Sequence, residues 1–377
     1  MDVFSINTPP LYSLIFIKVT HLQLDQITFT RFIAALSVVF FHYGMDVFPA
    51  NIPYLHEAVT AGPIAVNYFY ILSGFIMAIA YYQPQQASNF NKWKYWLARF
   101  ARIYPIYLIA LLLIAVVKYK TLSDDILTLP LHLTMLQAWV PGYPITLNTP
   151  GWSLSVEAFF YLCFPFLLLS IYKYGTQRLV IFAVLLWLAT QATLLTLLNS
   201  DAYVAKSLLH DFIYYNPLMH LNAFIAGFLT GVFFKNKKTK ISKYNSAWLV
   251  FSVILITALL AFRPSIENII GIKLAFTNGL IAPAFLLFII LLAQEKGKIV
   301  SIFSNKWLVL LGEASFSLYI LQKPLHGVYD KLIGNTVSLS DELHFYIFLA
   351  LLIIASIISY KYFETPMRKT INNLYKS

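Results

Sequence analysis

Residues 30–44 read TRFIAALSVVFFHYG, an apolar run that carries Arg31 at its start and His42 near its end. An α-helix turns about 100° and rises about 1.5 Å per residue, so Arg31 and His42 are separated by about 1100° and about 16 Å. That rotation is within roughly 20° of three full turns, and both side chains are expected on one face. Ionisable groups at membrane depth are costly and commonly functional. The run therefore favours a helix that faces a polar pocket. The alternative interpretation is a snorkelling Arg31 and a His42 bonded to a backbone carbonyl inside the bundle.

The composition predicts an all-α, polytopic integral membrane protein. Of the 377 residues, 59% are hydrophobic and 11% are charged, and the mean hydropathy is +0.70. Soluble domains carry about 25% charged residues. The net charge of +11 is attributed to Lys and Arg on cytoplasmic loops, so no nucleic-acid partner is expected. The single cysteine, Cys163, excludes an intrachain disulfide and a cysteine-based metal site, and no metal is expected.

About ten segments have the roughly 20 apolar residues that a membrane-spanning helix needs. They are roughly 27–44, 62–81, 99–117, 153–172, 179–198, 213–234, 247–263, 273–293, 305–323 and 343–362. The short apolar stretch 126–140 is interpreted as an interfacial or re-entrant piece of a loop.

The distribution of basic residues predicts both termini in the cytoplasm. With that orientation, 20 of the 27 Lys and Arg lie on cytoplasmic segments. The outer side then holds Lys118, Lys120, Lys206, Arg263, Lys273, Lys323 and Lys331. The chain is expected to form one domain over 1–377, with a short N-terminal segment 1–23 and no fused soluble domain. The apolar run 11–17 is too short for a signal peptide's core, so the N-terminus is expected to be retained.

Two arginines stand three residues apart in the stretch RFARIYPIY, residues 99–107. Arg99 and Arg102 are neighbours on one helix face. Guanidinium groups offer planar, bidentate donors that suit phosphate. Arg31 is expected at the same depth, so the three arginines are candidates for an anion site. Anchoring at the cytoplasmic boundary is the alternative interpretation.

Glu157 lies in the stretch TPGWSLSVEAFFYLCFP, residues 149–165. One interpretation is an acid favoured near a helix start that Ser153 caps. The other is a carboxylate that orients and polarises the imidazole of His42, as in general-base catalysis. In the second span, Ser73 and Gly74 are interpreted first as a site of close helix packing.

Seven stretches together resemble the membrane-bound acyltransferase-3 family, in the family's order and over nearly the whole chain. They are TRFIAALSVVFFH (30–42), YFYILSGFIMA (68–78), RFARIYPIY (99–107), GWSLSVEAFFYLCFP (151–165), NPLMHLNAFIAGFLTG (216–231), LGEASFSLYILQKPL (311–325) and YFETPMRK (362–369). The chain departs from the family pattern at three positions. His220 and Ala223 stand where the family usually has Arg and Glu, and Gln322 stands where it often has His.

The resemblance implies a bacterial O-acyltransferase (EC 2.3.1.-) of the cytoplasmic (inner) membrane. Its donor would be acetyl-CoA or another acyl-CoA, bound through its phosphates by Arg31, Arg99 and Arg102. The acceptor would be a hydroxyl of an envelope or exported polysaccharide or glycolipid. His42 would serve as general base or carry the acyl group transiently, oriented by Glu157. Residues expected to contact substrate are Ser73, Trp152, Ser153, Ser155 and Tyr319.

Two other classes of protein fit parts of the pattern. An anion or proton-coupled carrier would also have buried Arg and His and a broken helix at 149–151. Inverted repeats are expected in many carriers, but the two halves of this chain show no correspondence. A non-catalytic lipid or glycan receptor is the third option. Turnover separates the classes, because an acyltransferase consumes acyl-CoA and requires His42.

Overall fold

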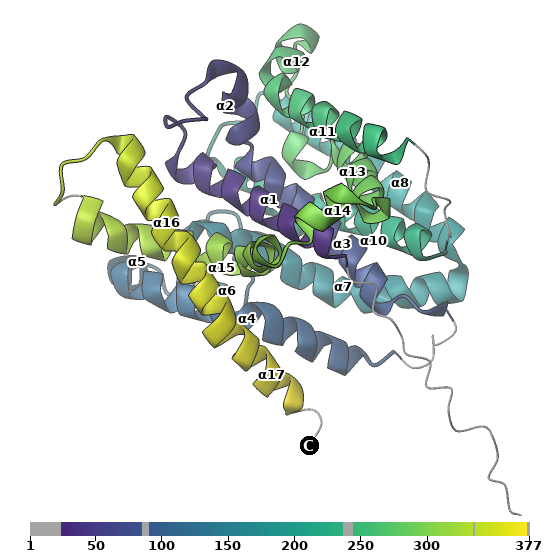
Figure 1. The fold of residues 1–377 in the computed structure, drawn as a ribbon, viewed down its shortest axis with the longest axis horizontal. Coiled ribbons are helices and arrows are strands. Elements are labelled where there is room, and N and C mark those ends of the chain that lie inside the picture. The colour runs from purple at the N-terminus through teal and green to yellow at the C-terminus, as the bar shows by residue number, and fades with distance from the viewer. Residues whose placement is uncertain (1–23, 85–89, 237–243, 335, 375–377) are drawn as a thin grey trace, which may run out of the picture.

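The computed structural model describes residues 24–84, 90–236, 244–334 and 336–374, and within these ranges it is helical without any β-strand (Figure 1). The all-α prediction is confirmed. The predicted N-terminal segment 1–23 and residues 237–243 of the basic loop lie outside the described residues.

Each of the ten predicted spans contains an α-helix. These helices are α1 (Asp25–Tyr43), α3 (Gly62–Tyr81), α4 (Lys92–Val117), α7 (Trp152–Tyr174), α8 (Thr176–Leu198), α10 (Leu221–Asn236), α11 (Asn245–Ala261), α13 (Ala282–Gln294), α15 (Lys306–Tyr329) and α16 (Asp341–Ser359).

Shorter elements connect or extend these helices. The α-helical ones are α2 (Pro53–Val59), α5 (Tyr119–Asp124), α6 (Thr128–Leu133), α9 (Leu208–Tyr215), α12 (Arg263–Ile270), α14 (Lys298–Phe303) and α17 (Thr365–Asn373). Single 3₁₀ turns are η2 (Gln137–Trp139), η3 (Thr149–Gly151), η4 (Pro217–His220) and η5 (Phe276–Asn278), and π-helical turns are η6 (Asp330–Gly334) and η7 (Tyr360–Glu364).

Among the described residues, six helical segments are long and apolar enough to cross a membrane, or seven if α11 and α12 count as one span bent by 61°. The six are Gly62–Tyr81, Lys92–Val117, Thr149–Tyr174, Thr176–Leu198, Leu208–Asn236 and Asp341–Asn373. Helix α13 is apolar but shorter. Helices α1 and α15 fall outside this set because their polar residues, among them Arg31 and Lys323, lower their mean hydropathy.

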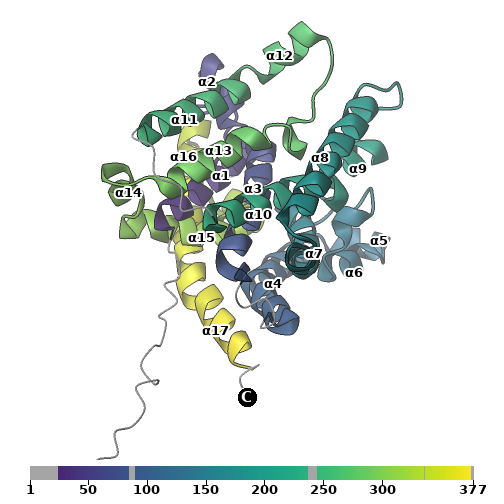
Figure 2. The ribbon, with the colours of Figure 1, turned by 90° about the vertical axis from the view of Figure 1, so that its right-hand side faces the viewer.

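Hydrogen bonds between helices lie at both ends of the helix bundle. At one end, the Gln83 amide donates to the Tyr172 hydroxyl at 2.9 Å, and the Lys235 ammonium donates to the Ile79 carbonyl at 2.9 Å. We call this the inner end, because the orientation predicted from the sequence places it at the cytoplasm. At the opposite, outer end, the Lys323 ammonium donates to the Thr149 hydroxyl. Helices α2 and α12 lie at the top and α17 at the bottom of both views (Figures 1 and 2).

Helices α3 and α10 pack with their backbones in contact at Gly74 and Gly227. A Cβ at Gly74 would lie 2.1 Å from the Phe224 carbonyl oxygen, and one at Gly227 would lie 1.9 Å from the Ile71 carbonyl oxygen. Distances this short are impossible for a real side chain, so only glycine fits both positions. The close approach predicted at Ser73 and Gly74 is therefore present, and it fixes the α3 residues that line the site described below.

Replacing Gly227 by alanine should destabilise the protein, because the added methyl group overlaps the backbone of α3. Overpacking of this kind costs about 1–3 kcal/mol or more. Gly327→Ala is the matched control, since a Cβ there meets nothing within 4 Å. The measurement is thermal unfolding in detergent. Equal unfolding temperatures for the two variants would contradict the packing described for α3 and α10.

Candidate functional site

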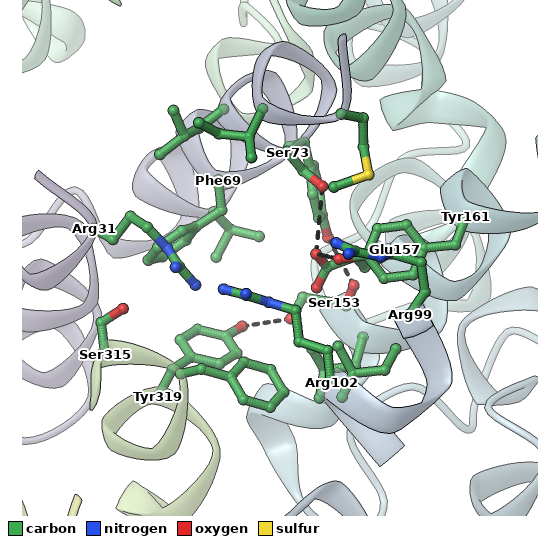
Figure 3. A pocket seen from close by; sticks show the side chains of 18 residues that line it. Arg31, Phe69, Ser73, Arg99, Arg102, Ser153, Glu157, Tyr161, Ser315 and Tyr319 are labelled. Atoms are coloured by element: carbon green, nitrogen blue, oxygen red, sulfur yellow. Dashed lines mark hydrogen bonds between the residues drawn. The ribbon is translucent and has the colours of Figure 1, made fainter. Parts of the chain in front are cut away.

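A cavity of about 820 Å³, part of it open to its surroundings, lies between α1, α3, α4, α7 and α15 (Figure 3). We call it the central cavity. Its polar lining is Arg31, Tyr70, Ser73, Arg99, Arg102, Ser153, Glu157, Tyr161, Ser315 and Tyr319. Its apolar lining includes Val66, Phe69, Ile76 and Met77 from α3. The cavity thus gathers polar groups from five helices inside an otherwise apolar bundle.

Two of its guanidinium groups face each other across the central cavity. Arg31 projects from α1 and Arg102 from α4, and Figure 3 shows their side chains pointing toward one another. Within the described residues, neither makes a hydrogen bond or an ion pair; the ion pairs there are Arg263–Glu57 and His326–Asp330. Because like charges repel, an anion between Arg31 and Arg102 would lower the energy of the site.

Arg99 is held by aromatic rings at the edge of the central cavity. Its guanidinium carbon lies 5.6 Å from the ring centroid of Tyr81 and 5.9 Å from those of Tyr95 and Tyr161. These are cation–π distances, which stabilise a desolvated cation. One terminal nitrogen donates to the Tyr81 hydroxyl at 3.2 Å, while the buried Nε has no partner in the described residues. Arg99 therefore keeps an unused donor.

Glu157 brings a carboxylate to the arginines. Its Oε1 accepts hydrogen bonds from the hydroxyl of Tyr161, one turn along α7, and from the Ser73 hydroxyl at 3.4 Å. His42 is not among its hydrogen-bond partners in the described part of the chain. The geometry thus places Glu157 with the guanidinium groups.

The outer part of the central cavity is closed by a hydroxyl pair. The Ser153 and Tyr319 hydroxyls lie 2.8 Å apart, and the Tyr319 ring packs edge-on against Phe69 with centroids 6.0 Å apart. Tyr319 lies on α15 and Ser153 at the start of α7, so this pair ties two of the cavity's helices together.

His42 lies at the outer end of α1, beyond the lining of the central cavity. The ring of the neighbouring Tyr43 stacks on that of His326, with centroids 4.1 Å apart, and His326 is seven residues beyond Tyr319 on α15. This end of α1, which carries His42, therefore lies beyond the Tyr319 end of the central cavity, toward the outer end of the bundle.

Of the ten residues predicted from sequence, seven line the central cavity, and His42, Trp152 and Ser155 do not. The Trp152 ring packs on Tyr215, with centroids 5.0 Å apart. The Ser155 hydroxyl donates to the Met135 carbonyl at 2.5 Å, which attaches the loop 126–140 to α7.

The three departures from the family pattern are buried. His220 is 1% exposed and its Nε2 lies 2.9 Å from the Tyr214 carbonyl oxygen. Gln322 is 0% exposed and donates to the Tyr319 carbonyl at 2.7 Å. Ala223 packs in the hydrophobic core. None of the three lines the central cavity.

Sequence reasoning missed several polar residues around the arginines. Tyr161 could have been found, because it follows Glu157 by four residues and shares its helix face. A smaller cavity of about 300 Å³ adjoins Arg102 and is lined by Glu313, Glu364 and Arg368. The last two belong to the closing stretch YFETPMRK, whose place beside Arg102 depends on tertiary packing. Among the described residues, no group of three or more His, Cys, Asp or Glu could hold a metal ion.

Comparison with known proteins confirms the resemblance at family level. The model of the acyltransferase-3 family, described as an acyltransferase domain, matches residues 24–361. The acyltransferase MdmB of Streptomyces mycarofaciens is 33% identical over 171 residues, 42% of each chain. A Staphylococcus aureus protein named "Putative O-acetyltransferase" is 22% identical over 366 residues, which cover 90% of this chain and 56% of that protein.

A third relative, from Acidianus two-tailed virus, is named "Putative acetyltransferase" and is 26% identical over 320 residues, 83% of this chain and 87% of that protein. The matches span only 42% and 56% of the lengths of the first two relatives. No solved structure matches the chain.

The facing guanidinium groups predict that inorganic pyrophosphate stabilises the purified protein. A ligand that binds only the folded state adds about 2.7 kcal/mol at a hundred times its Kd, so the unfolding temperature should rise with pyrophosphate concentration. Arg102→Gln should abolish the rise. Arg178→Gln, which changes an exposed arginine outside the cavity, should retain it. An equal rise in all three proteins would contradict an anion site at Arg102.

Proposed function

The chain belongs to the acyltransferase-3 family, and from this premise we propose that it is a membrane O-acyltransferase (EC 2.3.1.-). It would move an acyl group, acetyl in the first instance, from a cytoplasmic acyl-CoA to a hydroxyl of an envelope or exported polysaccharide or glycolipid. The observation that carries the proposal is the central cavity, in which three guanidinium groups meet one carboxylate. Such a cavity suits a donor that brings several negative charges.

The arginines would bind the phosphates of the donor. Arg31 and Arg102 face each other without a protein partner for their donors, and Arg99 has an unused Nε. The oxygens of a pyrophosphate would accept hydrogen bonds from these N–H groups, and arginine binds phosphate groups in a bidentate manner. Glu157 would limit the net charge of the site and hold Tyr161 in place. No metal takes part in this proposal.

His42 would act at the acceptor end. As general base, it would take the proton of the acceptor hydroxyl while the oxygen attacks the thioester carbonyl. The C–S bond then breaks, the new C–O ester bond forms, and the CoA thiolate leaves and takes up a proton. A transient acyl-His42 intermediate is the alternative path, with the acyl group passed on in a second step. The position of His42 beyond the Tyr319 end of the central cavity fits an acceptor that arrives from the outer end.

The remaining predicted substrate residues fall into two groups. Ser73, Ser153 and Tyr319 line the central cavity, and we propose that they contact the acyl arm of the donor. Trp152 and Ser155 would act indirectly by holding α7 in place. Trp152 packs on Tyr215, and Ser155 is hydrogen-bonded to the loop at Met135.

For the whole chain, we propose about ten membrane-spanning helices with both termini in the cytoplasm, in the bacterial inner membrane, as a single domain over 1–377. In this arrangement α1, α13 and α15 also cross the bilayer, although α13 is shorter than the six apolar segments and α1 and α15 are more polar. The arrangement is supported by the bias of Lys and Arg toward one side of the membrane.

Replacing His42 by alanine should abolish acyl transfer. The measurement is the transfer of label from radiolabelled acetyl-CoA to cell-envelope carbohydrate in membranes that contain either the intact protein or His42→Ala. Loss of a general base lowers rates by about 10²–10⁴-fold. His56→Gln, in the short helix α2, is the control and should transfer label normally.

Equal transfer by His42→Ala would show that His42 is not the base. If the intact, folded protein transfers no label to any acceptor but moves an anion across the membrane, it is a carrier.

The proposed orientation predicts which positions react with an impermeant maleimide. In a Cys163→Ala background, Ser338→Cys, in the exposed loop before α16, should react in cells whose inner membrane is intact. Lys94→Cys, at the start of α4, should react only after the membrane is opened. The reverse result would place both termini outside.

A further inference from the structure

A second, more open cavity lies at the inner end of the bundle between the end of α3, the start of α4 and the end of α7; its volume is about 740 Å³ including the open space at its mouth. We call it the inner aromatic pocket. Four rings and two longer polar side chains dominate its lining: Tyr81, Phe90, Tyr95, Tyr172, Gln83 and Lys94. None of these residues was singled out by the sequence motifs.

The inner aromatic pocket adjoins the central cavity at Arg99. Tyr81 and Tyr95 line the pocket, and the Arg99 guanidinium, which lines the central cavity, lies 5.6 Å and 5.9 Å from their ring centroids. One layer of side chains, in which Tyr81 and Tyr95 pack on Arg99, therefore lies between the two spaces. A long ligand that occupies both would pass the guanidinium of Arg99 on its way.

The charges around the arginines distinguish this pocket from the other neighbouring space. The cavity beside Arg102 is the smaller of the two, and its lining already combines the guanidinium groups of Arg102 and Arg368 with the carboxylates of Glu313 and Glu364. The inner aromatic pocket has no carboxylate in its lining among the described residues, and its charged group is the exposed ammonium of Lys94. A ligand that is both flat and anionic fits the second space and not the first.

We propose that the inner aromatic pocket binds the adenine nucleotide of the acyl-CoA donor while the rest of the donor runs past Arg99 into the central cavity. This inference rests on the proposed function and assigns a part of the donor to each cavity. It makes Tyr172 and Lys94 specificity residues for the nucleotide end.

The chemistry of the lining matches a nucleotide. Aromatic side chains stack on bases, and an ammonium pairs with a phosphate as a point charge. Tyr172 is positioned for this role, because its hydroxyl accepts the Gln83 amide at 2.9 Å and its ring stacks on Tyr82 with centroids 5.8 Å apart. Lys94 is exposed at the mouth of the pocket, where the ribose 3′-phosphate of CoA would lie.

A comparison of two donors tests the proposal. S-acetyl-4′-phosphopantetheine carries the same thioester as acetyl-CoA but lacks the nucleotide. Tyr172→Ala and Lys94→Gln should each raise the KM for acetyl-CoA, by roughly tenfold for the loss of a stacking ring, and leave kcat unchanged. The KM for S-acetyl-4′-phosphopantetheine should not change. Tyr174→Ala, two residues along α7 and exposed, is the matched control and should match the intact protein with both donors.

Equal increases in KM for both donors, or no increase for acetyl-CoA in the well-exposed Lys94→Gln variant, would overturn the proposal. A second readout does not need turnover: adenosine 3′,5′-bisphosphate should raise the unfolding temperature of the intact protein and not that of Lys94→Gln or Tyr172→Ala. If the bisphosphate binds in this way but no acyl transfer occurs, the pocket is correct and the proposed function is wrong. If transfer occurs and the bisphosphate has no effect, the pocket assignment is wrong.

Discussion

The structure depends on the burial of three guanidinium groups inside an apolar helix bundle. Removing such charges from water is costly unless other groups replace the lost solvation. Three tyrosine rings replace part of the lost solvation of Arg99. The carboxylate of Glu157 lines the same cavity as the three arginines. Arg31 and Arg102 remain without a hydrogen-bonding partner in the described residues. A site that retains unsatisfied cations in a low-dielectric interior is prepared for an anion, and the proposed function follows from that state.

The scaffold explains how the cavity stays open. The glycine contact between α3 and α10 brings those two backbones together, so α3 is fixed from behind while its other face lines the cavity. The lining residues from α1, α4, α7 and α15 then surround the arginines. Tyr319 and Ser153 join α15 to α7 at the outer side. This arrangement separates the charged groups from His42 along the bundle, as the proposed reaction between a cytoplasmic donor and an outer acceptor would require.

Spacing alone indicated part of the lining of the central cavity, and the predicted residues that lie outside this lining do so for a common reason. The three-residue spacing of Arg99 and Arg102 predicted one shared cavity, and the helical class followed from composition. All the residues singled out in the motif around Glu157 were predicted to belong to the site, although their side chains point in different directions. Ser153 and Glu157 are four apart and share the face that lines the cavity, whereas Trp152 and Ser155 are three apart and share another. Which face turns inward is set by tertiary packing, as is the absence of His42 from the hydrogen bonds of Glu157.

The central claim is that the arginine cavity holds the phosphates of an acyl-CoA donor. A structure of the protein determined with CoA bound in a lipid nanodisc tests it most directly. The account predicts the pyrophosphate between the guanidinium groups of Arg31, Arg99 and Arg102, with the thiol end directed toward His42. CoA bound elsewhere, with the central cavity empty, would contradict the account.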